Sequence, residues 1–158
     1  MDSRSPQVAL LSIRPEYAEA ILSGDKRVEF RRTRFARRVS FVVIYATQPI
    51  GKVVGWFEVD GIDACPPEEL WHKFRDCAGI GEDAFLQYYA GSETGYAIRV
   101  RTAFRLQRSK TLEHVSGTAK PPQSFAYLPK DTAQRVLAYA GIRTSDLRVS
   151  LQESTASN

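Results

Sequence analysis

Short apolar runs with the two-residue repeat of strands alternate along the chain with segments that have the three-to-four-residue repeat of amphipathic helices. The run from Ser40 to Ala46 is almost continuously apolar, which indicates a strand buried on both faces. Other strands are expected over residues 8–13, 25–31, 52–60 and 96–106, and helices over residues 16–23, 66–77, 82–89 and 129–140.

These elements number about six strands and three or four helices, without the regular alternation of a parallel sheet. We therefore predict an α+β fold in which a mixed or barrel-like sheet is flanked by helices. The 158 residues, 43% hydrophobic and 25% charged, suit a single domain over residues 1–150, followed by a disordered tail over 151–158. No apolar run is long enough to cross a membrane, and two cysteines, Cys65 and Cys77, suit the reducing cytoplasm.

Positive charge is concentrated in one segment. Between Asp25 and Arg38 seven basic residues accompany two acidic ones, a net charge of +5, whereas the whole chain carries only +4. Guanidinium groups bind phosphate oxygens in pairs, so we predict phosphate contacts for Arg34, Arg37 and Arg38. The expected partner is RNA or a nucleotide, with DNA as an alternative; the other interpretation is a solvated surface loop.

A first candidate ligand site lies at the start of this segment. Lys26 follows the turn at Gly24 and is free to lean over a strand face from which Glu29 and Arg31 project. A carboxylate between two cations is expected to stay ionised and to accept a hydrogen bond from a base, while Lys26 and Arg31 donate to oxygens. The alternative is a simple surface salt bridge.

A second candidate is the irregular loop from Pro121 to Phe125, which two prolines stiffen. Here Ser124 offers a hydroxyl for hydrogen bonding and Phe125 a ring for stacking on a base. The alternative is that Phe125 fills part of the core.

Two other kinds of site are not predicted from the sequence. Cys65, His72 and Cys77 are the one cluster of metal-ligating types, but His72 and Cys77 lie five residues apart on an expected helix and do not converge, so neither a metal site nor a cofactor is predicted. His114 and Ser116 lie two residues apart on an expected strand, but no carboxylate is placed to orient the histidine for a serine hydrolase.

Gly24, Lys26, Glu29 and Arg31 match the motif Gly-x-Lys-x-x-Glu-x-Arg, and with residues 11–18 and 121–125 they resemble the bacterial and archaeal branch of the ASCH domain family. This family belongs to the PUA-like superfamily. The resemblance implies a PUA-like β-barrel with helices beside it and a cleft at the motif. Relatives are thought to bind RNA or nucleotides, some with regulatory roles, and others are small enzymes: a ribonuclease and an amidohydrolase of an acetylated cytidine nucleoside.

In the amidohydrolase pattern a lysine activates a threonine three residues later. Lys26 matches this lysine, but Glu29 occupies the threonine position, and an opposing carboxylate should keep the lysine protonated and unsuited to act as a base. The sequence therefore predicts an RNA- or modified-nucleotide-binding module, with a regulatory or protein-interaction role as one alternative. A small hydrolase of RNA or a modified nucleoside, using Lys26 and Glu29, is the other.

Overall fold

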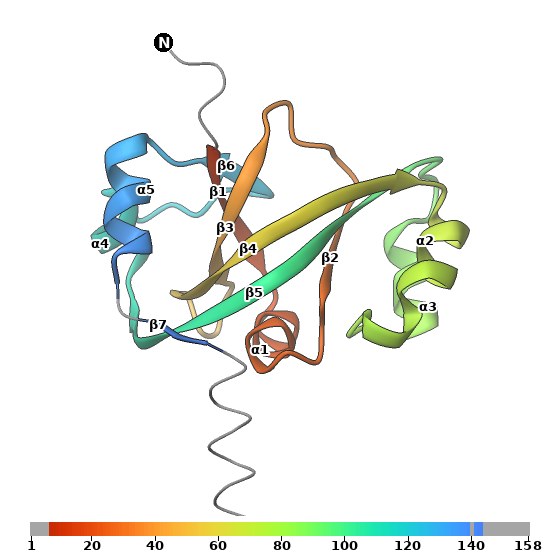
Figure 1. The fold of residues 1–158 in the computed structure, drawn as a ribbon, viewed down its shortest axis with the longest axis horizontal. Helices are drawn as coiled ribbons and strands as arrows, with labels where there is room; N and C mark the ends of the chain where they lie inside the picture. The colour runs from red at the N-terminus through yellow and green to blue at the C-terminus, as the bar shows by residue number, and fades with distance from the viewer. Residues whose placement is uncertain (1–6, 140, 144–158) are drawn as a thin grey trace, which may run out of the picture.

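The computed structural model describes residues 7–139 and 141–143 (Figure 1). All its strands belong to one sheet in the order β2-β5-β4-β3-β1-β6, with β7 paired to β5. The strands are β1 (Gln7–Ile13), β2 (Val28–Arg31), β3 (Val39–Ala46), β4 (Lys52–Cys65), β5 (Gly95–Lys110), β6 (Phe125–Tyr127) and β7 (Gly141–Arg143). The helices are α1 (Pro15–Ser23), α2 (Pro67–Phe74), the 3₁₀ turn η1 (Arg75–Cys77), α3 (Glu82–Tyr88), α4 (Leu112–Ser116) and α5 (Lys130–Leu137).

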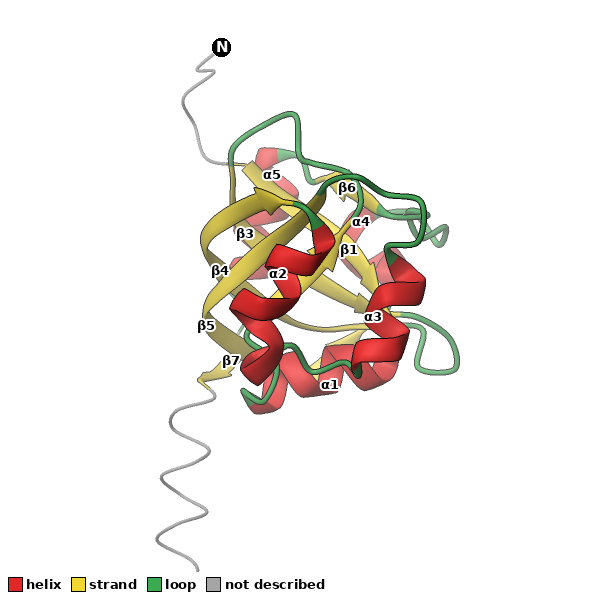
Figure 2. Cartoon of the chain, turned by 90° about the vertical axis from the view of Figure 1, so that its right-hand side faces the viewer, coloured by secondary structure: helices red, strands yellow, loops and turns green. Residues whose placement is uncertain are grey.

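The sheet is mixed and strongly curled. β1 pairs with β3 in parallel, while every other pairing is antiparallel. The long strands β4 and β5 shift register at several points, and such bulges bend a strand and increase its twist. Figure 2 shows the strands wrapping into a half-barrel with helices around it. The predicted α+β, barrel-like fold is confirmed.

Three groups of helices cover the sheet (Figure 1). α1 packs over one core cluster that β1, β3 and β5 share. α4 and α5 lie together at one end and cover a second cluster, and α2 with α3 cover a third cluster beside β2. Both faces of β2 are consequently enclosed.

The approach of α1 to the sheet depends on Gly55 in β4. A Cβ atom at this position would lie 2.4 Å from the carbonyl oxygen of Phe104 and 2.6 Å from Cδ2 of Leu22 in α1. A glycine therefore allows the helix to contact the backbone of the strand pair directly.

The structure differs from the expected elements in the second half of the chain. Residues 112–116 form α4 rather than a strand, because the Thr111 hydroxyl accepts from the backbone N–H of His114 and caps a short helix. β6 and β7 were not expected, and β4 continues to Cys65. The expected tail over residues 151–158 lies outside the described residues. Within the described part, no helix has the length and apolar character needed to span a membrane.

Candidate functional site

The turn after α1 directs Lys26 inward. Pro15 starts the helix, and Gly24 ends it in the left-handed conformation with φ of 87°. The backbone N–H of Lys26 then donates to the carbonyl of Ala20, and that of Arg27 donates to the carbonyl of Cys77. The chain therefore enters β2 with fixed geometry and not through a mobile turn.

Lys26 is buried, with 3% of its surface exposed. Its amino group donates to the carbonyl oxygen of Ala78 at 2.5 Å and lies 5.2 Å and 5.0 Å from the ring centroids of Tyr17 and Phe30. Its aliphatic stem passes so close to Gly79 that a Cβ there would lie 2.6 Å from Cβ of Lys26. The expectation that Lys26 leans freely from the turn is wrong.

Glu29 is also buried, although the two-residue alternation placed it on the outer face of its strand. Val28 and Phe30 belong to the cluster covered by α2 and α3, as expected of the inward face. The opposite face points into the curled sheet, where Glu29 pairs with Ile98 of the core cluster under α1. One carboxylate oxygen lies 3.6 Å from the Arg31 guanidinium, and the other, Oε2, has no hydrogen-bond partner.

Burial dominates the titration of both groups. It raises the pKa of Glu29 above its ordinary value despite the opposing charges of Lys26 and Arg31. It lowers the pKa of Lys26 despite the attraction of Glu29. Both pKa shifts are therefore opposite in direction to the shifts expected from the neighbouring charges, because desolvation disfavours both charged forms more strongly.

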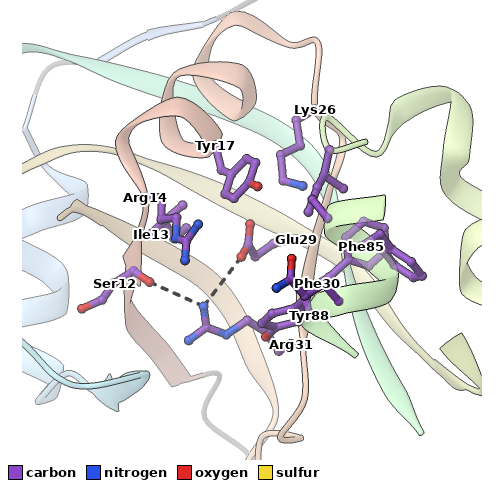
Figure 3. Close-up of a pocket in the computed structure, with 13 residues that line it drawn as sticks. Ser12, Ile13, Arg14, Tyr17, Lys26, Glu29, Phe30, Arg31, Phe85 and Tyr88 are labelled. Carbon is purple, nitrogen blue, oxygen red and sulfur yellow. Dashed lines mark hydrogen bonds and ion pairs between the residues drawn. The ribbon is translucent and has the colours of Figure 1, made fainter. Parts of the chain in front are cut away.

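These side chains share a cavity of about 440 Å³ between α1, β2 and α3 (Figure 3). The amino group of Lys26, the carboxylate of Glu29 and the guanidinium groups of Arg14 and Arg31 turn towards the same space. The cavity is lined by Ser12, Ile13, Arg14, Tyr17, Lys26, Glu29, Phe30, Arg31, Ile80, Ala84, Phe85, Gln87 and Tyr88. It is large enough for a small-molecule or nucleotide site.

Arg31 connects this cavity to the loop that precedes β6. Its Nη2 donates to the carbonyl oxygen and hydroxyl of Ser124 at 2.9 Å and 2.6 Å, and its Nη1 lies 3.5 Å from the carbonyl of Ser12. Arg31 and Ser124, both predicted to bind a ligand, thus lie together, but in this structure Arg31 donates its hydrogen bonds to Ser124.

Phe125 does not line the cavity. Its ring packs edge-on against Phe35, with 4.8 Å between centroids, and also contacts Tyr127. Phe35 belongs to the core cluster under α1, and Phe125 and Tyr127 pack against that cluster. A role for Ser124 and Phe125 in recognising a base stays a prediction, while the packing matches the alternative that Phe125 fills the core.

Arg34, Arg37 and Arg38 lie on the exposed loop between β2 and β3, away from the cavity. The Arg37 guanidinium lies 4.7 Å from the ring of Tyr127. Their predicted contact with phosphate stays a prediction.

The sequence did not single out several residues of the cavity wall. Arg14 is exposed at its mouth, and Tyr17 and Tyr88 provide aromatic walls. No local pattern in the helix expected over residues 82–89 marks Tyr88, because only the folded position of α3 opposite α1 shows that this side chain faces the motif. Among the described residues, no group of three or more His, Cys, Asp or Glu side chains is arranged to hold a metal ion.

The family model of the ASCH domain matches residues 11–115, which contain the motif and every residue that lines the cavity. The chain belongs to this family. It is 32% identical over 133 residues to an ASCH domain-containing ribonuclease from Zymomonas mobilis, covering 82% of this chain and 90% of that protein.

The crystal structure of an ASCH protein from Zymomonas mobilis superposes on the chain with a TM-score of 0.74 and 31% identity, over 83% of this chain and 94% of the other. The chain is also 26% identical over 128 residues to a large ribosomal subunit protein uL22 from Ureaplasma parvum. That match covers 80% of this chain but 41% of the ribosomal protein.

Proposed function

We propose that this ASCH domain binds single-stranded RNA or a modified nucleotide and takes one unstacked nucleotide into the cavity between α1 and α3. The observation that carries the proposal is the carboxylate of Glu29, which is buried in the cavity and has one oxygen, Oε2, without a hydrogen-bond partner. A buried polar atom of this kind is stabilised when a ligand supplies the missing donor.

The rest of the cavity fits a nucleotide. Tyr17 and Tyr88 offer aromatic surface to a base, and an N–H of the base edge can donate to Glu29. Since Arg31 is engaged with Ser124, the exposed guanidinium of Arg14 at the mouth is the better placed group for phosphate. The similarity to an ASCH domain-containing ribonuclease supports RNA as the ligand class.

Cleavage of RNA is a second candidate function, favoured by the titration of the buried pair. Burial shifts Lys26 towards its neutral amine and Glu29 towards its protonated acid. A neutral amine could take the proton of a ribose 2′-hydroxyl as its oxygen attacks the adjacent phosphorus. The protonated carboxyl could give its proton to the departing 5′-oxygen, leaving a 2′,3′-cyclic phosphate and a 5′-hydroxyl end.

Binding is tested with a 5′-fluorescein-labelled single-stranded RNA hexanucleotide by fluorescence anisotropy. Glu29→Gln and Arg14→Gln should each weaken binding about tenfold, because the first changes the unpartnered acceptor oxygen Oε2 and the second removes a charge-assisted hydrogen bond to phosphate. Arg108→Gln, an exposed arginine at the far end of β5, is the control and should bind as the parent does. Unchanged affinity in both site variants would refute the proposed pocket.

Cleavage is tested by incubating the same RNA with the parent and with Lys26→Met. Accumulation of 2′,3′-cyclic phosphate products with the parent, and their loss with Lys26→Met, is the result expected of the enzyme. Intact RNA that is nevertheless bound tightly would restrict the function to binding.

A further inference from the structure

We propose that a single strand of RNA continues from this cavity along the segment Arg31–Arg38 and places another nucleotide in a second cavity at the far end of that segment. The inference rests on the proposed function and extends it from one nucleotide to a strand. It is carried by the location of the second cavity, by the arginines of the loop, which pair with no carboxylate of the described residues, and by the rigid anchoring of the loop.

The second cavity measures about 360 Å³ and lies between the end of the loop that joins β2 to β3, the start of β3, and the middle of β4 and β5. Arg37 and Arg38 line it from the loop, and Glu58, Asp60 and Arg101 line it from the strands. Arg31 lines the first cavity, so the two ends of one eight-residue segment reach the two cavities. In Figure 1 this segment runs from the upper end of β2 to the upper end of β3.

The arginines of the loop differ from those of β5 in their partners. Arg99, Arg101 and Arg105 on β5 each form ion pairs with carboxylates of β4 or α1. Within the described residues, the exposed arginines of the loop form no ion pair with any carboxylate: Arg32, Arg34, Arg37 and Arg38. The fold therefore neutralises one set of arginines and leaves the other available to an anionic chain.

The loop is held in place although it is exposed. Phe35, in its middle, is buried against Phe125, and the backbone N–H groups of Ala36 and Arg37 donate to the Tyr127 hydroxyl at 3.0 Å and 3.2 Å. The carbonyl of Arg38 accepts from the N–H of Gln7 in β1. A loop fixed in this way loses little conformational entropy when it binds a ligand.

Two guanidinium groups are also positioned by aromatic rings. Arg32 lies 5.1 Å from the ring of Tyr88, which lines the first cavity, and Arg37 lies on Tyr127 beside the second. Stacking holds the planar group while leaving donors for phosphate. Fully extended, the chain from Arg31 to Arg38 spans at most about 25 Å, so a short oligonucleotide suffices to reach both cavities.

The second cavity has two walls of different chemistry. Arg37 and Arg38 suit the phosphates, whereas Glu58 and Asp60 opposite them accept hydrogen bonds. The hydrogen bond from Arg101 lowers the pKa of the Asp60 carboxyl, which therefore stays ionised and acts only as an acceptor. A base with an exocyclic amino group fits this wall, and a double helix would hide such an edge from it.

The experiment compares a nucleoside monophosphate with single-stranded RNAs of two, four and six nucleotides, by calorimetry with the full chain. Affinity should rise at least tenfold from the monophosphate to the hexanucleotide. Arg37→Gln/Arg38→Gln should remove this gain and leave the affinity for the monophosphate within twofold of the parent. The control variant Arg105→Gln/Arg108→Gln removes the same charge near the C-terminal end of β5. It should retain most of the gain in affinity with RNA length.

Salt dependence gives an independent measurement. For a single strand, two phosphate contacts contribute about 1.4 to the magnitude of the slope of log affinity against log salt concentration. A fourfold rise in salt should therefore weaken hexanucleotide binding by the parent about sevenfold more than binding by Arg37→Gln/Arg38→Gln. Equal affinity for RNAs of all lengths would refute the proposed path of the RNA strand, while the proposed one-nucleotide pocket would stand. Failure of every RNA and the monophosphate to bind would instead refute the proposed function itself.

Discussion

Arg31 donates two hydrogen bonds to Ser124, one to its carbonyl oxygen at 2.9 Å and one to its hydroxyl at 2.6 Å. β2 is an edge strand that pairs only with β5, so this side chain joins it to the segment leading into β6 across the open side of the half-barrel. The same guanidinium contacts Glu29, whose burial makes the ion pair important for the fold.

Arg31→Ala should therefore lower the free energy of unfolding by about 2–3 kcal/mol, because it removes several charge-assisted hydrogen bonds and leaves Glu29 unpaired. Urea unfolding measures the effect. Ser124→Ala, which removes only the bond to the hydroxyl, should lower it by about 0.5–1.5 kcal/mol. Glu29→Gln/Arg31→Ala should be more stable than Arg31→Ala, and a double variant that is less stable would contradict this explanation.

Gly79→Ala should displace Lys26 from its carbonyl partner. Gly79 has φ of 62°, and an added Cβ would lie 2.6–2.9 Å from three carbons of the Lys26 stem. Gly91→Ala is a matched control, because Gly91 has φ of 82° but a Cβ there meets nothing within 4 Å. Both variants should lose about 1 kcal/mol of stability from backbone strain, measured by thermal unfolding. Only Gly79→Ala should also weaken RNA binding, and equal binding by both variants would contradict the predicted displacement.

The raised pKa of Glu29 predicts how stability depends on pH. As pH rises above the ordinary glutamate pKa of 4.5, the unfolded chain releases the proton of this carboxyl while the folded protein still retains it. The folded state therefore loses stability from this group until the pH exceeds the raised pKa of Glu29. A glutamine side chain cannot titrate, so the advantage of Glu29→Gln over the parent in urea unfolding should grow between pH 4.5 and 8. An advantage that shrinks over this range would show that the pKa is lowered.

Phe125→Ala distinguishes base stacking from core packing. The ring contacts Phe35 and Tyr127, so its removal should lower the free energy of unfolding by about 1–3 kcal/mol. Phe35→Leu, which alters the same contact from the buried side, should also destabilise the protein. If Phe125→Ala instead unfolds like the parent but binds the RNA hexanucleotide about tenfold more weakly, the ring stacks on a base.

Periodicity predicted most elements because their core residues repeat along the chain. The apolar run at Ser40–Ala46 became β3, and the Pro15-to-Gly24 interval became α1 with its expected start and stop. The helix α4 was missed because five residues are too short to show a helical repeat, and a single cap at Thr111 decides its start.

The site was predicted only in part, for a different physical reason. The motif located Lys26, Glu29 and Arg31 correctly beside one another, but alternation distinguishes two strand faces without saying what covers each. Because the sheet curls, the polar face of β2 lies inside the fold. Desolvation there reverses the expected direction of the pKa shifts of Lys26 and Glu29. Tyr88 enters the same cavity from a helix more than 50 residues away, which no local pattern indicates.

The lack of a side chain at Gly55 determines how closely α1, which carries Tyr17, approaches the sheet. Since α1 rests on the backbone of β4 and β5 at this point, any larger residue would lift the helix together with Tyr17, which forms one wall of the cavity. An alanine at position 55 would push α1 away from β4 and β5. The distance between Tyr17 and Tyr88 across the cavity would then change, although neither residue is substituted.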